Sequence, residues 1–70
     1  MQLSARNQLN GTVSNVELGA VMAEVTVDVN GQPIVSVITR ASAERLGLAE
    51  GQPVTVFIKA TEVLLGVDEN

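Results

Sequence analysis

The alternation of valine with polar residues constrains the fold of this chain more than any other feature. Val25, Val27 and Val29 alternate with acidic and threonine residues, so that one face of this segment is apolar and the other is polar. A period of two residues is typical of a strand with one buried face. An Asn30-Gly31 pair follows directly, and the β-rich run "IVSVIT" comes shortly after it. Because an Asn-Gly pair between β-formers favours a two-residue type I′ turn, the sequence predicts a β-hairpin here.

Three further segments predict strands and bring the expected number to five. In "NGTVSNVEL", Val13 and Val16 are out of phase, and a bulge near Ser14-Asn15 would restore their common face. The segment "PVTVFIKA" alternates in the same way as the central hairpin, and "EVLLGV", residues 62–67, is predicted to be the last strand.

One short helix is predicted, in "SAERLG". Ser42 is the expected N-cap, and Gly47 supplies the left-handed residue that ends the helix. Leu46 and Leu48 are expected to close one end of the core. Five strands with a short helix between the third and the fourth predict an all-β fold, a small five-stranded OB-like barrel, in a single domain over residues 1–70.

The size of the chain predicts that it associates with copies of itself. A chain of 70 residues buries only about 60% of the surface that it exposes when unfolded, which leaves a small margin of stability. The sequence contains no Cys and no His, so neither a disulfide nor a zinc site can supply what is missing. Apolar residues make up 46% of the chain and charged residues 17%, a ratio that leaves apolar side chains on a monomer's surface. We therefore expect a homo-oligomer.

Composition excludes several classes of function. Without Cys or His, and with acidic residues scattered singly, the chain has no pattern for a directly ligated metal. A Ser/Lys pair of Ser4 or Ser42 with Lys59 is the one catalytic arrangement that the residues would allow, and we expect no enzyme. A net charge of −4 and a single aromatic residue also disfavour a nucleic-acid partner, because phosphates are held by basic grooves and bases by stacking aromatics.

The beginning of the chain and its apolar runs predict a cytoplasmic protein. Polar and charged residues follow Met1 closely, without the pattern of a signal peptide, and no apolar run approaches the roughly 18 residues of a membrane span. We therefore expect a soluble protein without a membrane partner.

The few basic residues stand beside small hydrogen-bond donors. Arg6 lies in "SARNQ", between a hydroxyl and two carboxamides, Lys59 ends a predicted strand, and Thr39 and Ser42 flank the predicted helix start. Cations, hydroxyls and backbone N–H groups together suit a small anion. Each residue also has a structural interpretation: Arg6 and Lys59 as solvated surface cations, and Ser42 as a cap alone. The other two arginines, Arg40 and Arg45, are assigned to the surface.

Two stretches of the sequence resemble those of a known family. The stretches "SARNQLNGTV" and "VITRASAERLGLAEGQPVTVFIKATEV" are similar to the molbindin (Mop) family of molybdate-binding TOBE modules, over nearly the whole length. The resemblance implies an OB-like barrel that binds molybdate or tungstate as an intact oxyanion and stores it in the cytoplasm. It also implies hexamers, built as trimers of dimers, with the anions held between subunits and a second class of sites near symmetry axes.

The resemblance also implies which residues bind the oxyanion. The side chains carried over are Ser4, Arg6, Thr39, Ser42 and Lys59, and the backbone amides are those of Ala5 and Ala60. Asn7 and Gln8 are expected to fix the strand and the interface. Several members of the family have Ser after the lysine, whereas Ala60 offers only its N–H, so a donor is lost here or moved to Thr61.

Binding and storage without catalysis is the leading hypothesis. The alternative is a ligand-sensing or interaction module of a molybdate-responsive regulator or a transport system. Such proteins need further domains, and this sequence has neither a helix-turn-helix segment nor a nucleotide-binding motif, which favours the free-standing role. An OB-type nucleic-acid binder is the third and least favoured hypothesis.

Overall fold

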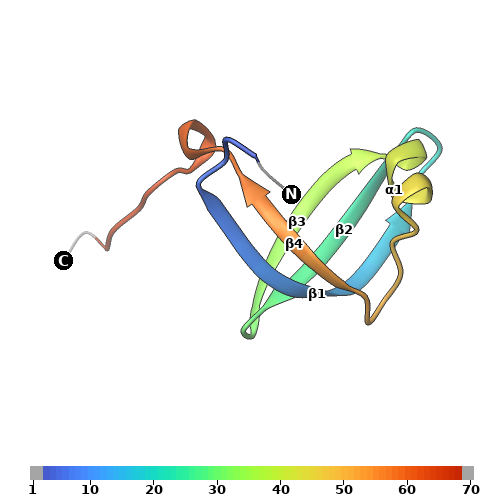
Figure 1. The fold of residues 1–70 in the computed structure, drawn as a ribbon, viewed down its shortest axis with the longest axis horizontal. Coiled ribbons are helices and arrows are strands. Elements are labelled where there is room, and N and C mark those ends of the chain that lie inside the picture. The colour runs from blue at the N-terminus through green and yellow to red at the C-terminus, as the bar shows by residue number, and fades with distance from the viewer. Residues whose placement is uncertain (1–2, 69–70) are drawn as a thin grey trace.

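A single antiparallel sheet dominates the computed structural model, which describes residues 3–68 (Figure 1). The spatial order of its strands is β3-β2-β1-β4. The elements in chain order are β1 (Asn7–Leu18), β2 (Met22–Val29), β3 (Gln32–Thr39), α1 (Arg40–Leu46), β4 (Pro53–Ile58) and the 3₁₀ turn η1 (Ala60–Glu62).

The turn between β2 and β3 confirms the predicted hairpin. Asn30 has φ 52° and Gly31 has φ 86°, and a type I′ turn requires positive φ at both of these positions. The Asp28 carboxylate accepts a hydrogen bond of 3.4 Å from the Gly31 N–H. The strands leave the turn in register, with Val29 opposite Gln32.

Strand β1 is the longest in the sheet and pairs with two partners, β4 along its first half and β2 along its second half. The predicted bulge is confirmed by a shift of register between Val13 and Asn15. At Gly11, strands β1 and β2 come very close: a Cβ there would lie 2.6 Å from Val27 Cγ1 and 2.7 Å from the Asp28 carbonyl oxygen. Glycine therefore lets β1 pack closely on β2 where the strand changes partner.

Helix α1 begins earlier than the sequence predicts. Thr39, and not Ser42, is the N-cap, because its Oγ1 accepts the Ser42 N–H and Arg40 already has helical geometry. The end of the helix is as predicted, since Gly47 takes φ 64°, and the Leu48 N–H closes the turn on the Ala43 carbonyl at 3.1 Å.

The core lies on the concave side of the sheet and is built from valines. Val13, Val25 and Val27 are its buried centre. Leu48 packs against this cluster, as predicted, but Leu46 is 58% exposed, so its predicted role in closing the core is wrong in this chain. The remaining partly buried residues of the core are Val16, Val29, Ile38, Val54 and Val56.

The predicted fifth strand is not part of the sheet. Of residues 62–67, Glu62 ends η1 and the rest form an irregular segment that extends away from the body of the molecule (Figure 1). Within residues 3–68 the sheet therefore has four strands, remains open, and has β3 and β4 as its two edges. The expected closed barrel is absent from the described chain because no strand bridges those edges.

Candidate functional site

The ladder between β1 and β4 ends where two of the four cations lie. Its last pair is Asn7 opposite Ile58. Arg6 directly precedes Asn7 and Lys59 directly follows Ile58, so a continuation of this register would set Arg6 opposite Lys59. Figure 1 likewise places the N-terminal segment beside η1.

Local hydrogen bonds fix the backbone next to these two cations. The Asn7 carboxamide donates to the Ile58 carbonyl at 3.2 Å, and the Gln8 carboxamide donates to the Ala5 carbonyl at 3.1 Å. The Glu62 N–H donates to the Lys59 carbonyl at 2.8 Å. Asn7 and Gln8 thus fix the strand as predicted, and each bond constrains a residue beside or at one of the cations.

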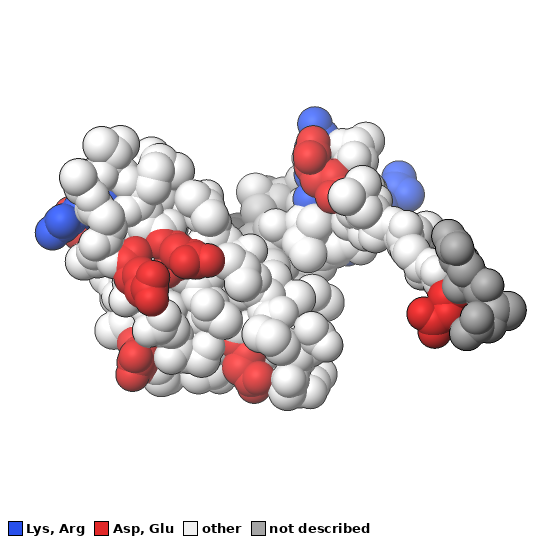
Figure 2. Space-filling model, turned by 180° about the vertical axis from the view of Figure 1, so that it is seen from behind, with Lys and Arg blue, Asp and Glu red and all other residues white. Residues whose placement is uncertain are grey.

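Arg6 and Lys59 are both exposed, and neither has an ion-pair partner among residues 3–68. Figure 2 shows Lys and Arg side chains in two separate places, on the α1 side and beside the base of the C-terminal segment, with acidic side chains between them. Two like charges on neighbouring strands repel each other until an anion compensates them. Two of the four cations of a protein whose net charge is −4 therefore lie at this end of the sheet, and η1 adds one carboxylate, Glu62, close to them (Figure 2).

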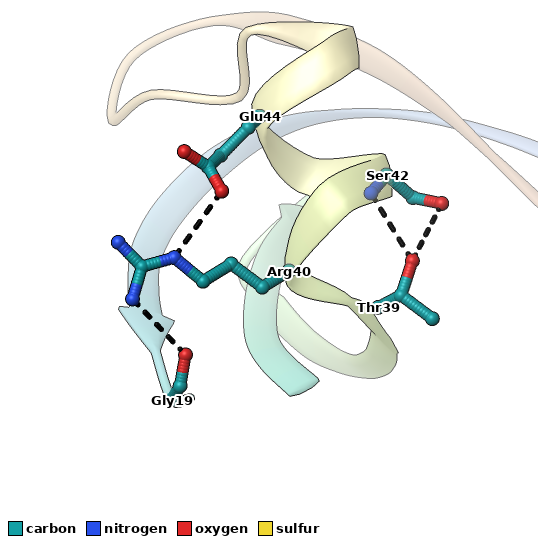
Figure 3. A network of polar contacts seen from close by, with 5 residues as sticks. All are labelled: Gly19, Thr39, Arg40, Ser42 and Glu44. Atoms are coloured by element: carbon teal, nitrogen blue, oxygen red, sulfur yellow. Dashed lines mark hydrogen bonds and ion pairs between the residues drawn. The ribbon is translucent and has the colours of Figure 1, made fainter. Parts of the chain in front are cut away.

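The two predicted hydroxyl ligands lie together at the start of α1 (Figure 3). The Thr39 hydroxyl donates to Ser42 Oγ at 2.8 Å and accepts the Ser42 N–H at 3.1 Å. Because the Thr39 hydrogen is used within the pair, the Ser42 O–H is the donor that remains for a ligand. Thr39 consequently orients the half-buried Ser42 side chain as well as capping the helix.

Arg40 has a role that the sequence analysis missed. Its Nε lies 3.2 Å from Glu44 Oε1, and its Nη1 donates to the Gly19 carbonyl at 3.2 Å (Figure 3). Its backbone N–H also donates to the Val21 carbonyl at 2.8 Å, so Arg40 ties α1 to the turn between β1 and β2. Its side chain lies at the surface as predicted, 43% exposed, but it also anchors the helix. The i, i+4 spacing of Arg40 and Glu44 was the signal available in the sequence. Arg45 is exposed, as predicted.

The structure separates the predicted ligands into two groups. Ser4, Ala5, Arg6, Lys59 and Ala60 gather at the Asn7 end of β1, where Ala5 is half-buried and the others are exposed. Thr39 and Ser42 lie at the other end, because Leu18 pairs with Ala23 on β2, and Met22, the next residue on β2, pairs with Thr39.

The path of β1 from one end to the other is about 36 Å, taking roughly 3.3 Å for each residue, and Figure 1 shows α1 and the turn after β4 at opposite ends of the sheet. One chain therefore carries two separate groups of donors, here called the cation half-site (the Ser4 to Arg6 segment with Lys59 and Ala60) and the hydroxyl half-site (Thr39 and Ser42). A small anion cannot touch both half-sites of the same chain.

The fold and these residues define a small β-domain suited to an anion, since cations, hydroxyls and backbone N–H groups can all donate hydrogen bonds to one. Residues 3–65 match the TOBE domain family. The chain is 44% identical over 66 residues to molybdenum-pterin-binding protein 3 of Clostridium pasteurianum, covering 93% of this chain and 97% of that protein. The chain thus belongs to the TOBE domain family, and its resemblance to the molbindin (Mop) proteins is confirmed.

Solved structures agree with this assignment. A molybdate-binding protein from Sporomusa ovata matches with a TM-score of 0.91 at 39% identity, over 96% of this chain and all of that chain. The cytoplasmic molybdate-binding protein ModG, in a form with molybdate bound, matches with a TM-score of 0.90 at 46% identity. This chain is covered to 97% in that match but spans only 49% of ModG, so the same module also occurs within longer chains.

Among residues 3–68, no three acidic side chains come together as a metal site would require. No helix in this part of the chain is both long enough and apolar enough to cross a membrane.

Proposed function

We propose that this chain binds molybdate or tungstate as an intact oxyanion, at sites formed between subunits of a homo-oligomer, and stores or buffers it in the cytoplasm. The observation that carries the proposal is the division of the ligand residues between opposite ends of β1. A site of this composition needs the cation half-site of one subunit and the hydroxyl half-site of another. The molybdate-binding relatives support the choice of anion.

Each group has a distinct role in the proposed site. Arg6 and Lys59 compensate the two charges of the anion, and Ser4 adds a hydroxyl donor. The amides of Ala5 and Ala60 donate from the two backbone segments that face each other. From the second subunit, the Ser42 O–H donates to an oxyanion oxygen while Thr39 holds it in place. The protein forms no bond to the central metal atom, and the site carries out no reaction.

A site composed only of donors selects its anion by protonation state. Molybdate and tungstate are fully deprotonated dianions at neutral pH, so each of their oxygens can accept a hydrogen bond. Phosphate carries a proton on average at this pH, and the cations and N–H groups of the site cannot accept it; a hydroxyl of the site would have to turn from donor to acceptor. Sulfate is deprotonated but smaller, so a pocket sized for molybdate leaves some of its donors too far away.

A bare oxyanion fits this site better than a pterin-bound metal, although several curated relatives have molybdenum-pterin in their names. Flat rings are commonly bound by stacking on aromatic side chains. The chain contains one aromatic residue, Phe57, which lines an apolar groove on β4 and not a half-site.

For the assembly we propose a hexamer, organised as a trimer of dimers. It would supply both the composite sites and the apolar burial that a chain of 70 residues lacks on its own. Sedimentation at micromolar concentration measures this directly, and a stable monomer that binds no anion would contradict the proposal.

The ligand is tested by calorimetric titration with molybdate, tungstate, sulfate and phosphate at one ionic strength. We expect similar affinities for molybdate and tungstate and much weaker binding of sulfate and phosphate. Equal affinities for sulfate and molybdate would refute storage of molybdate, because the site would then respond to charge alone.

A further inference from the structure

One acidic residue, Glu62, lies beside the cation half-site. It ends the 3₁₀ turn η1, which begins directly after Lys59, and its N–H donates to the Lys59 carbonyl at 2.8 Å. Figure 2 shows an acidic side chain next to the Lys and Arg side chains at the base of the C-terminal segment. One turn of 3₁₀ helix advances the chain by only about 6 Å, so the fold keeps this carboxylate close to Lys59.

The side chain of Glu62 does not hold the fold together. It is exposed, and it forms no ion pair with Lys59 or with any other cation in the range 3–68. The η1 turn is held instead by backbone hydrogen bonds, from the Glu62 N–H to Lys59 and from the Val63 N–H to the Ala60 carbonyl at 3.4 Å. These bonds form with any side chain at position 62, so the carboxylate is free to act on a ligand that binds beside it.

This carboxylate changes the charge balance of the proposed site. Arg6 and Lys59 supply two positive charges, and the two residues of the hydroxyl half-site supply none. With these residues alone, a bound dianion would leave the group neutral. With Glu62 included, the empty group carries a charge of about +1 and the occupied group about −1, so the last charge of a dianion is bound against repulsion.

We propose that Glu62 limits the affinity of the site for dianions and thereby keeps the stored anion exchangeable. The inference rests on the proposed function, because it concerns the same site. A storage site has to release its anion as well as bind it, and one repelling carboxylate weakens binding without the loss of any donor. Because the repulsion is proportional to the charge of the ligand, a dianion is weakened more than a monoanion of the same shape.

Coulomb's law gives the expected size of the effect. For a dianion and one carboxylate at a separation on the order of 8 Å in water, loss of the carboxylate charge should tighten binding by about 6-fold. For a monoanion the factor is the square root of this value, about 2-fold. Salt should abolish both effects, because the Debye length falls from about 30 Å at 0.01 M to about 3 Å at 1 M ionic strength.

The variant Glu62→Gln tests the inference by calorimetric titration with two tetrahedral anions. Molybdate is a dianion, and perrhenate is a monoanion of similar size, whose affinity can be measured by displacement of molybdate. At about 0.01 M ionic strength we expect the variant to bind molybdate about 6-fold and perrhenate about 2-fold more tightly than the parent. At about 1 M both affinities should equal those of the parent.

Two control variants separate the charge of Glu62 from its shape and from the net charge of the protein. Glu62→Asp keeps the charge, so its molybdate affinity should stay within about 2-fold of the parent. Glu50→Gln removes the same charge from an exposed position before the beginning of β4, whereas Lys59 follows the end of this strand, and it should also stay within about 2-fold. Urea unfolding of all three variants should match the parent, because both side chains are exposed.

Three results would overturn the inference: an unchanged or weaker molybdate affinity in Glu62→Gln, an equal gain in Glu50→Gln, or an equal gain for perrhenate and molybdate. If Glu62→Gln bound molybdate as the parent does while Lys59→Gln bound it more weakly, the inference would fail and the proposed function would stand. A parent protein that bound neither molybdate nor tungstate would refute the proposed function, and the inference with it.

Discussion

Replacing Lys59 with Gln separates a ligand-binding lysine from a solvated surface lysine. In the single chain Lys59 is exposed and has no ion-pair partner within residues 3–68, so its loss should change the free energy of unfolding by less than about 0.5 kcal/mol. In the proposed site the same change removes one charge-assisted hydrogen bond to a dianion. Such a bond contributes about 1.5 to 3 kcal/mol, which corresponds to a loss of affinity of roughly 10- to 150-fold.

Arg6→Gln should weaken the binding of molybdate at least as much as Lys59→Gln. The guanidinium can donate two parallel hydrogen bonds to one oxyanion, whereas the ammonium acts as a point charge. Both variants are titrated calorimetrically with molybdate at fixed ionic strength, and their unfolding by urea is measured in parallel.

The control for both substitutions is Arg45→Gln. It removes the same charge from the same acidic protein, at an exposed position in the last turn of α1 that has no ion pair among residues 3–68. We expect its molybdate affinity to stay within about 0.5 kcal/mol of the parent. If all three variants lowered the affinity for molybdate equally, the cause would be the general loss of positive charge, and the assignment of Arg6 and Lys59 to the site would be refuted.

Two further predictions concern the scaffold and are read from urea unfolding. Gly11→Ala should lower the free energy of unfolding by about 1 to 3 kcal/mol, because the added Cβ would lie 2.7 Å from the Asp28 carbonyl oxygen, which cannot move without the backbone. The control is Gly66→Ala, which should leave the free energy of unfolding unchanged, because nothing lies within 4 Å of the added Cβ. Arg40→Gln should lower the free energy of unfolding by about 1 kcal/mol, since it removes the exposed ion pair with Glu44 and one hydrogen bond to the Gly19 carbonyl. Amide hydrogen exchange in α1 should also become faster. An unchanged exchange rate in α1 would show that Arg40 does not anchor the helix.

The features that the sequence predicts correctly are those decided by neighbouring residues. The hairpin turn requires only that Asn30 and Gly31 adopt positive φ, and the end of α1 requires only the left-handed Gly47. The N-cap depends on more than local preference, since Thr39 and Ser42 are both good caps. The tertiary bond from the Arg40 N–H to the Val21 carbonyl favours Thr39, and the sequence does not reveal a bond between residues 19 positions apart.

The fifth strand and the binding site were harder to predict for one common reason. Apolar composition indicates that residues 62–67 suit an extended conformation, but a strand exists only where a neighbour accepts its hydrogen bonds. The resemblance likewise implies seven ligand residues without saying whether one chain can bring them together. Only the topology shows that Thr39 and Lys59 lie at opposite ends of the sheet. Both questions therefore depend on contacts between distant segments, which a single sequence does not describe.

If each anion site combines the cation half-site of one chain with the hydroxyl half-site of another, two defective variants should complement each other. Lys59→Gln damages only the cation half-site, and Ser42→Ala damages only the hydroxyl half-site. In a mixed pair, one site receives both defects and the other receives none. With random two-fold pairing, about a quarter of all sites should therefore regain the parental molybdate affinity after the two variants are unfolded and refolded together. Calorimetry would show this as a tight-binding fraction that neither variant has alone. A mixture that binds as the simple average of its two components would mean that each site lies within one chain, against the separation of the half-sites along β1.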